Sequence, residues 1–351
     1  MLFYRKRKTA TACSENKLPY IISASAKLPN KSALIQWIEA SKNSLNEELA
    51  SRGAILLRGF DIESPSDFEE VVSAFDTKLG GEYLGTSPRS KKTEKIFNAS
   101  ELPGHFPIMQ HCEMSFLKNA PEKLFFFCKR EPSYGGETPI CDFRKVYAQI
   151  DPRIRNEFET KGVKYIRNYF SPYQKKKTAF ELKRWNEVFN TDDKNRVEQK
   201  CLETDTEVQW KEDNTLRLIN KNSAVKDHPV TKEKVWFNHA QVFHSLSAAE
   251  EYRNIHKRQR RFKTFLLSLY LTVITWINKQ YKDPMSNGMH VTFGDGSAIP
   301  ESYIRHIQNV IWKNLIIFTW KKGDVLFIDN LSTSHGRLPY EGDREVLVCW
   351  S

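Results

Sequence analysis

Residues 323–350 read GDVLFIDNLSTSHGRLPYEGDREVLVCW, and they predict two buried strands joined by a polar loop. The runs VLFID and EVLVCW have the length and the aliphatic and aromatic content of strands in a sheet. His335 lies in the loop between them, and Arg344 follows nine positions later. The chain therefore presents a possible metal ligand and a permanent positive charge between two strands.

A second segment, Gln110–Phe116, reads QHCEMSF and supplies two further candidate ligands. If it is extended, His111 and Glu113 point to one face and Cys112 points away. Two histidines and one carboxylate are the ligands of ferrous oxygenases, which leave open positions for an oxo acid and for O₂. We therefore group His111, Glu113 and His335 as a candidate iron site, although a surface ion pair and a solvated histidine are the ordinary alternatives.

Arg344 suits a carboxylate ligand because its guanidinium is planar, always charged and able to donate two parallel hydrogen bonds. A dicarboxylate held on the metal at one end would meet such a group at its other end. The alternative is a surface ion pair with Glu341 or Asp343.

The rest of the chain predicts helices and short strands in alternation, with no internal repeat and no evident linker. We expect one elaborated domain. The expected elements are a helix over 32–53 ended by Gly53, a buried strand at 54–60, a helix after Ser64, strands at 123–130 and 139–143, helices on both sides of Pro152, and an inserted helical region with loops from 171 onward.

Composition is that of a globular protein, with 40% hydrophobic and 28% charged residues. Six scattered cysteines without a CxxC pair favour reduced thiols and an intracellular, cytoplasmic location. The basic N-terminus lacks an apolar core, so we expect no secretory signal, and a mitochondrial presequence stays open.

Residues 265–277, FLLSLYLTVITWI, are too few to span a membrane, so we predict a buried helix, with an interfacial helix on a membrane or a partner as the alternative. The net charge is +11. We interpret the basic clusters as solvated surface, and a nucleic acid or an anionic membrane remains an unfavoured alternative. They lie at Arg5–Lys8, Arg89–Lys95, Lys175–Lys177 and Arg253–Lys263.

A set of motifs in fixed order runs from about Pro29 to Trp350. Through these motifs the chain resembles the TauD/TfdA family of Fe(II)/2-oxoglutarate dioxygenases, particularly its clavaminate synthase-like and SyrP-like members. The motifs are RGAILLRGF at 52–60, GTSPR at 85–89, QHCEMSF, PEKLFFFC at 121–128, GGETPICDFRKVY at 135–147, VWFNH at 235–239, FGDGSAIP at 293–300, and the ending quoted first.

This resemblance implies a mainly β (α+β) fold with a double-stranded β-helix, or jelly-roll, core and surrounding helices. It implies an N-terminal extension at 1–28 and a dioxygenase domain at 29–351 with a helical insertion around 171–285. It also implies that His111, Glu113 and His335 bind Fe(II), and that Thr138 and Arg344 hold 2-oxoglutarate, which reacts with O₂.

The expected reaction is hydroxylation or desaturation of an amino acid or another small carboxylate, with 2-oxoglutarate converted to succinate and CO₂. Glu113 stands where halogenases of the family carry a small residue, which argues against halogenation. The candidate substrate contacts are Asn98, Ser100, Asn238 with its neighbour His239, and Arg337, although Arg337 could instead brace its loop.

Three alternatives remain open. They are an oxygenase that acts on a nucleic acid or a protein through the basic surface, a non-catalytic binding protein, and a zinc hydrolase with the same ligands. The sequence gives no oligomeric state.

Overall fold

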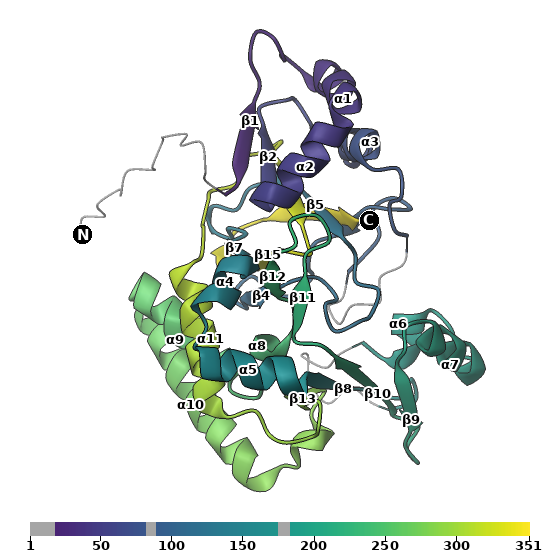
Figure 1. Ribbon diagram of the computed structural model, residues 1–351, viewed down its shortest axis with the longest axis vertical. Coiled ribbons are helices and arrows are strands. Elements are labelled where there is room, and N and C mark those ends of the chain that lie inside the picture. Colours follow the sequence, from purple (N-terminus) through teal and green to yellow (C-terminus); the bar gives the residue numbers. More distant parts are fainter. Residues whose placement is uncertain (1–17, 82–88, 175–182) are drawn as a thin grey trace.

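The largest sheet joins the two ends of the chain (Figure 1). The computed structural model describes residues 18–81, 89–174 and 183–351, and within these ranges six strands pair in the order β1-β2-β14-β5-β17-β3. Their bounds are β1 Tyr20–Ser23, β2 Ala54–Arg58, β14 Val325–Asp329, β5 Lys123–Arg130, β17 Glu345–Trp350 and β3 Phe97–Asn98. β1 is parallel to β2, and the other pairs are antiparallel.

A small sheet carries the candidate site. It has the order β4-β15-β7, with β4 at Ile108–His111, β15 at Thr333–Arg337 and β7 at Ile140–Asp142. His335 in β15 is opposite His111 in β4 and opposite Ile140 in β7. The predicted loop around His335 is therefore a strand between two others, which fixes its backbone on both sides.

A further sheet has the order β13-β8-β10-β9, and two short ribbons pair β11 with β12 and β16 with β6. The bounds are β13 Met289–Phe293, β8 Val163–Tyr169, β10 Leu216–Asn222, β9 Glu207–Trp210, β11 Val225–Asp227, β12 Lys234–Trp236, β16 Tyr340–Glu341 and β6 Tyr134–Gly135. The region 171–285 is thus not purely helical, because it supplies β9 to β12. Its limits as an insertion remain a prediction.

Helices cover both sides of these sheets (Figure 1). In the described ranges they are α1 Lys31–Ala40, α2 Lys42–Arg52, α3 Pro65–Phe75, α4 Phe143–Gln149, α5 Pro152–Lys161, α6 Trp185–Phe189, α7 Lys194–Glu203, α8 Ala240–Phe243, α9 Ser247–Gln259, α10 Phe262–Tyr281 and α11 Glu301–Lys313, with a 3₁₀ turn at Pro284–Ser286. The predicted helix over 32–53 is two helices divided at Ser41.

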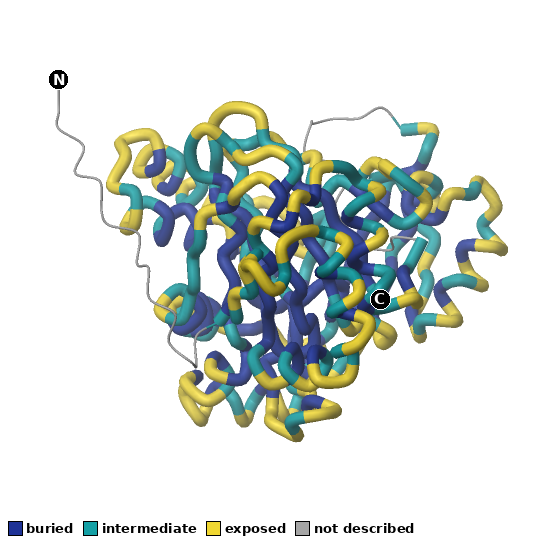
Figure 2. The backbone as a smooth tube through the Cα atoms, turned by 90° about the horizontal axis from the view of Figure 1, so that it is seen from above, coloured by how far each residue is buried: buried dark blue, intermediate teal, exposed yellow. Residues whose placement is uncertain are grey.

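The central strands are buried on both faces, so they read as continuous apolar runs. Phe125, Phe127 and Phe327 face one core, shared with α1, α2 and α3. Their neighbours Leu124 and Phe126 face the other core, which reaches β7 and the helices beyond it. The alternation follows from the two-residue period of a strand. Figure 2 shows this buried interior inside an exposed rim.

Helix α10 corrects one prediction. Residues 265–277 are helical, but their apolar side chains are exposed: Leu269 is 52% and Trp276 is 63% accessible to solvent. No helix among the described residues is long and apolar enough to cross a membrane.

Only part of the predicted N-terminal extension, residues 1–28, is among the described residues. Residues 1–17, with the cluster Arg5–Lys8, lie outside the described residues, as does Lys175–Lys177, whereas Tyr20–Ser23 form the edge strand β1. The five described cysteines are free, buried thiols.

Candidate active site

The QHCEMSF segment is extended only as far as His111, where β4 ends, and then turns. Met114 in this turn has a left-handed backbone, with φ 53°. Asn330, just after β14, holds the turn: its Oδ1 accepts from the Glu113 N–H at 2.6 Å, and its Nδ2 donates to the Glu113 carbonyl at 3.0 Å. Glu113 is therefore placed by a side chain from the other end of the chain.

The structure brings together the three predicted ligands. The rings of His111 and His335 lie 4.4 Å apart, between centroids. The Oε2 atom of Glu113 is 3.9 Å from Nε2 of His111 and 3.8 Å from Nε2 of His335. One donor atom from each residue lies within 4.8 Å of the other two, a spacing that could hold a metal ion.

The ionisation of this cluster also suits a metal. The Nδ1 atom of His111 lies 2.8 Å from the Met109 carbonyl, so Nδ1–H donates and Nε2 keeps its lone pair. Burial lowers the pKa of His111 and of His335, so both rings are neutral. Burial acts to raise the pKa of Glu113, but the charge of Arg89 and its hydrogen bond to the carboxylate outweigh it, and the net pKa is lowered. Neutral imidazoles and an ionised carboxylate are the forms that bind metals.

Arg89 is a site residue that the sequence analysis placed in a surface cluster. Its Nη2 lies 2.6 Å from Oε2 of Glu113, and both side chains are buried. Its guanidinium also lies 6.0 Å from the Trp350 ring. The signal was the GTSPR motif, of which residues 85–88 lie outside the described residues. Arg89 supplies the positive charge that keeps Glu113 ionised.

His239 also borders the cluster. Its ring meets the ring of His111 at 5.4 Å and that of Phe116 at 5.1 Å, and its Nδ1 lies 2.6 Å from the Ser115 hydroxyl. Burial holds the pKa of His239 well below its usual value. The neighbouring Asn238 is committed to the backbone, because it donates to the Ala224 carbonyl at 2.8 Å and accepts from the Ala240 N–H at 3.0 Å.

Thr138 and Arg344 lie together. The Arg344 Nη2 is 3.3 Å from Thr138 Oγ1, and its Nε donates to the Gly136 carbonyl at 2.9 Å. Trp320 Nε1 donates to the same threonine hydroxyl at 3.0 Å. Burial, followed by the charge of Arg337, lowers the pKa of Arg344 to about 10. A half-buried guanidinium beside a buried hydroxyl and an indole N–H is a polar recess suited to an anion.

The Arg344 recess lies on the same small sheet as the candidate metal ligands. The Gly336 N–H donates to the Pro139 carbonyl and the Leu338 N–H to the Glu137 carbonyl, at 3.1 Å each. These bonds continue the β15–β7 register, so Thr138 runs alongside β15 only a few residues from His335. Gly136, at φ 70°, leaves room for the arginine, because a Cβ there would lie 3.0 Å from Arg344 Cδ.

The remaining predicted contacts have structural partners. Arg337 donates to the carbonyls of Leu102, Pro103 and Phe106 at 2.7–3.0 Å, which favours the loop-bracing interpretation. Asn98 Nδ2 donates to Ser90 Oγ at 2.7 Å, and Ser100 Oγ accepts from the Leu102 N–H at 3.1 Å. None of these contacts reaches the three-residue cluster.

Comparisons with known proteins identify the family of this chain. A sequence model of the family described as Taurine catabolism dioxygenase TauD, TfdA family matches residues 22–350. The chain belongs to the TauD/TfdA family. Two TauD/TfdA relatives are the dapdiamide synthesis protein DdaC of Enterobacter agglomerans, 32% identical over 88% of this chain and 84% of that protein, and a clavaminate synthase-like protein of Arabidopsis thaliana, 30% identical over 93% and 90%.

Among solved structures, the PvcB protein of Pseudomonas aeruginosa is similar over 95% of this chain and 86% of its own, with 12% identity and a TM-score of 0.49. That likeness is too distant to transfer residues. From its TauD/TfdA membership, this protein is a dioxygenase that depends on Fe(II) and 2-oxoglutarate.

Proposed function

We propose that this TauD/TfdA dioxygenase hydroxylates or desaturates an amino acid or another small carboxylate, with His111, Glu113 and His335 as its iron ligands. The observation that carries the proposal is the convergence of these three donor atoms within 4.8 Å. Two histidines and one carboxylate leave the coordination positions that a chelating oxo acid and O₂ need. Bound Fe(II) and 2-oxoglutarate supply the oxidising chemistry, and 2-oxoglutarate leaves as succinate and CO₂.

The protein's own part is to bind, orient and exclude water. We assign the distal carboxylate of 2-oxoglutarate to Arg344 and Thr138, because they form the polar recess beside the small sheet. Trp320 fixes the threonine hydroxyl, and the Gly136 carbonyl fixes the arginine. His239 and Arg89 border the ligand cluster, and we assign them to the side from which the substrate approaches. Asn98, Ser100, Asn238 and Arg337 are assigned to holding the surrounding loops.

The relatives' names support a small-molecule substrate. One takes part in dapdiamide synthesis and the other is clavaminate synthase-like.

We further infer that the six-stranded and three-stranded sheets are the two walls of a jelly-roll, since one core cluster joins Phe126 of the first sheet to Ile140 and Cys141 of the second.

The test is succinate formation from 2-oxoglutarate by purified protein with Fe(II), ascorbate and a panel of amino acids and small acids. His111→Ala and His335→Ala should each lower turnover at least about 100-fold, because a ligand is lost. His306→Ala is the matched control, since His306 contacts the backbone N–H of Asp151 on the surface and should keep full turnover.

Arg344→Lys should raise the KM for 2-oxoglutarate about tenfold with little change in kcat, because lysine keeps the charge and loses the two-donor fork. Turnover that survives His335→Ala unchanged would overturn the ligand assignment, and turnover that needs zinc would overturn the assignment of iron.

A further inference from the structure

Helix α10 presents large apolar side chains to solvent, while its two buried residues are polar. Thr264 and Ser268 are its buried residues, where it packs on α9. Its large exposed hydrophobic residues form what we call the outer face: Phe262, Phe265, Leu266, Leu269, Tyr270, Val273, Trp276, Ile277 and Tyr281. An amphipathic helix at a water-facing surface has the opposite orientation.

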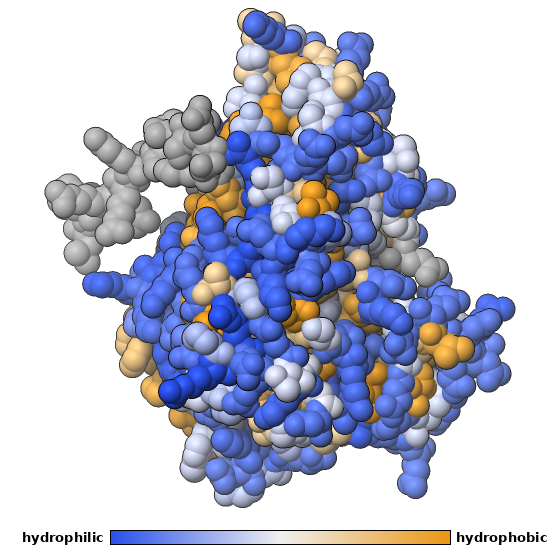
Figure 3. Space-filling model, viewed as in Figure 1, coloured by the Kyte–Doolittle hydropathy of each residue, from blue (hydrophilic) through white to orange (hydrophobic). Residues whose placement is uncertain are grey.

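The outer face is continuous along the helix. Its members recur at intervals of three and four residues, so they form one stripe over the whole 20-residue helix. Five of them are aromatic, and their exposed area together is on the order of 1,000 Å². That exceeds the roughly 300–600 Å² of the largest apolar patch on a typical soluble monomer. Figure 3 shows hydrophobic residues along the edge where Figure 1 places α10.

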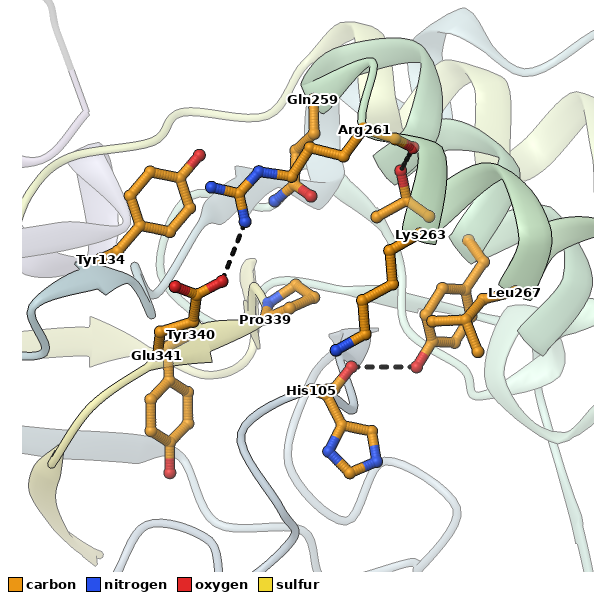
Figure 4. Close-up of a pocket in the computed structure, with 11 residues that line it drawn as sticks. His105, Tyr134, Gln259, Arg261, Lys263, Leu267, Pro339, Tyr340 and Glu341 are labelled. Atoms are coloured by element: carbon orange, nitrogen blue, oxygen red, sulfur yellow. Dashed lines mark hydrogen bonds and ion pairs between the residues drawn. The ribbon is translucent and has the colours of Figure 1, made fainter. Parts of the chain in front are cut away.

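Basic residues lie at both ends of this face and form what we call the basic border. Residues 253–282 contain eight lysines and arginines and no aspartate or glutamate. Arg261 pairs with Glu341 and lies 4.2 Å from the Tyr134 ring, as Figure 4 shows, and Lys279 pairs with Glu301. In the described part of the chain, no ion pair is recorded for the exposed Lys257, Arg258, Arg260, Lys263 and Lys282.

We propose that α10 docks the protein on an anionic lipid surface, lying in the plane of the membrane. Aromatic and aliphatic side chains would enter the boundary of the acyl chains, and the cations at both ends of α10 would meet lipid phosphates and carboxylates. The net charge of +11 favours the same partner.

A second copy of the chain fits less well, because the cations at the start of α10, Arg260 and Lys263, would meet like charges. In an antiparallel pair they approach Lys279 and Lys282, and in a parallel pair they approach each other. The apolar arc is also broader than the narrow seam of two paired helices. Docking is independent of the proposed substrate and of the iron ligands.

Flotation with vesicles tests the proposal. The full chain should float with vesicles of equal parts phosphatidylserine and phosphatidylcholine and stay behind with phosphatidylcholine alone. Added salt should weaken binding, because it screens the basic border. Leu269→Gln with Trp276→Gln should lower the vesicle-bound fraction about tenfold or more, because two apolar anchors are removed.

Leu202→Gln is the matched control: Leu202 on α7 is 81% exposed, more than Leu269, and its substitution should leave binding unchanged. Unaltered succinate formation by the α10 variant would show that the variant folds. Two results overturn the proposal. One is equal binding to both vesicle types. The other is a dimer by light scattering that the α10 substitutions convert to monomer, together with no vesicle binding.

Discussion

Glu113 is controlled by two residues that act on different parts of it. Asn330 holds its backbone through two hydrogen bonds, and Arg89 holds its carboxylate at 2.6 Å. The first contact fixes the position of the side chain and the second fixes its charge. A carboxylate that is already ionised and held in position needs little rearrangement to bind a cation. The same residue in a flexible loop would lose conformational entropy on binding.

Glu251 is a second buried carboxyl, and its pKa is raised where that of Glu113 is lowered. It lies between α9 and α11, and burial raises its pKa to about 7 against the hydrogen bond donated by Trp312 Nε1 at 2.9 Å. The folded chain therefore holds a proton that the unfolded chain, with a pKa of 4.5, releases earlier. Stability present below pH 4.5 is lost as the pH rises through about 7.

Glu251→Gln should remove this loss. The variant should match the native protein below pH 4.5 and gain about 2–3 kcal/mol in the free energy of unfolding above pH 7. Urea denaturation across this pH range measures the difference, with Glu39→Gln on the exposed side of α1 as the control. If the difference in free energy of unfolding between Glu251→Gln and the native protein stays constant with pH, the pKa of Glu251 is not raised in the folded chain.

At the scale of elements, the contact between α2 and β15 sets the position of His335. Gly53 ends α2 with φ 88°, and a Cβ there would lie 2.1 Å from the hydroxyl of Thr333, two residues before His335. The glycine thus serves both as a helix cap and as a close contact with the ligand strand.

Gly53→Ala should cost more than about 2 kcal/mol and lower succinate formation, because β15 must move. Gly296→Ala is a matched control: it has φ 89°, and its added Cβ meets nothing within 4 Å, so it carries the backbone strain alone, about 1 kcal/mol. Adding Thr333→Ala to Gly53→Ala should recover much of the difference. Equal losses for the two glycine variants would show that the clash is relieved elsewhere.

Hydrophobic periodicity in the sequence predicted most helices and strands, but it missed features that depend on contacts with distant residues. The capping box of Ser64 and Asp67 at α3 is local and could be read from the sequence. The α10 segment is helical as predicted, yet its burial depends on which side α9 covers, and that is not encoded in its own spacing. Arg89 was missed for the same reason, since its charge became a site feature only through contact with Glu113.

At the scale of the whole molecule, the three candidate ligands could be grouped from the sequence because chemistry limits which residues bind iron, but the way they converge could not be predicted. His335 was expected in a loop, whereas it is in the middle strand of a sheet, opposite His111. The order of strands in the large sheet, which joins both ends of the chain, also leaves no trace in local patterns. Long-range pairing is a property of the complete fold.

Metal binding should therefore stabilise the whole domain. Mn²⁺ at about 100 times its Kd should add about 2.7 kcal/mol, which raises Tm by roughly 5 °C, and a chelator should reverse it. Differential scanning fluorimetry measures the shift. His335→Ala should show no shift, and His306→Ala should keep it. A shift of the same size in His335→Ala would place the stabilising ion elsewhere.

The pairing of β4 with β15 also has a consequence for biosynthesis. His111 and Glu113 leave the ribosome well before the imidazole of His335 does. A nascent chain that has not yet released β15 cannot bring the three candidate ligands together, so we expect iron to be acquired only after β15 has paired with β4.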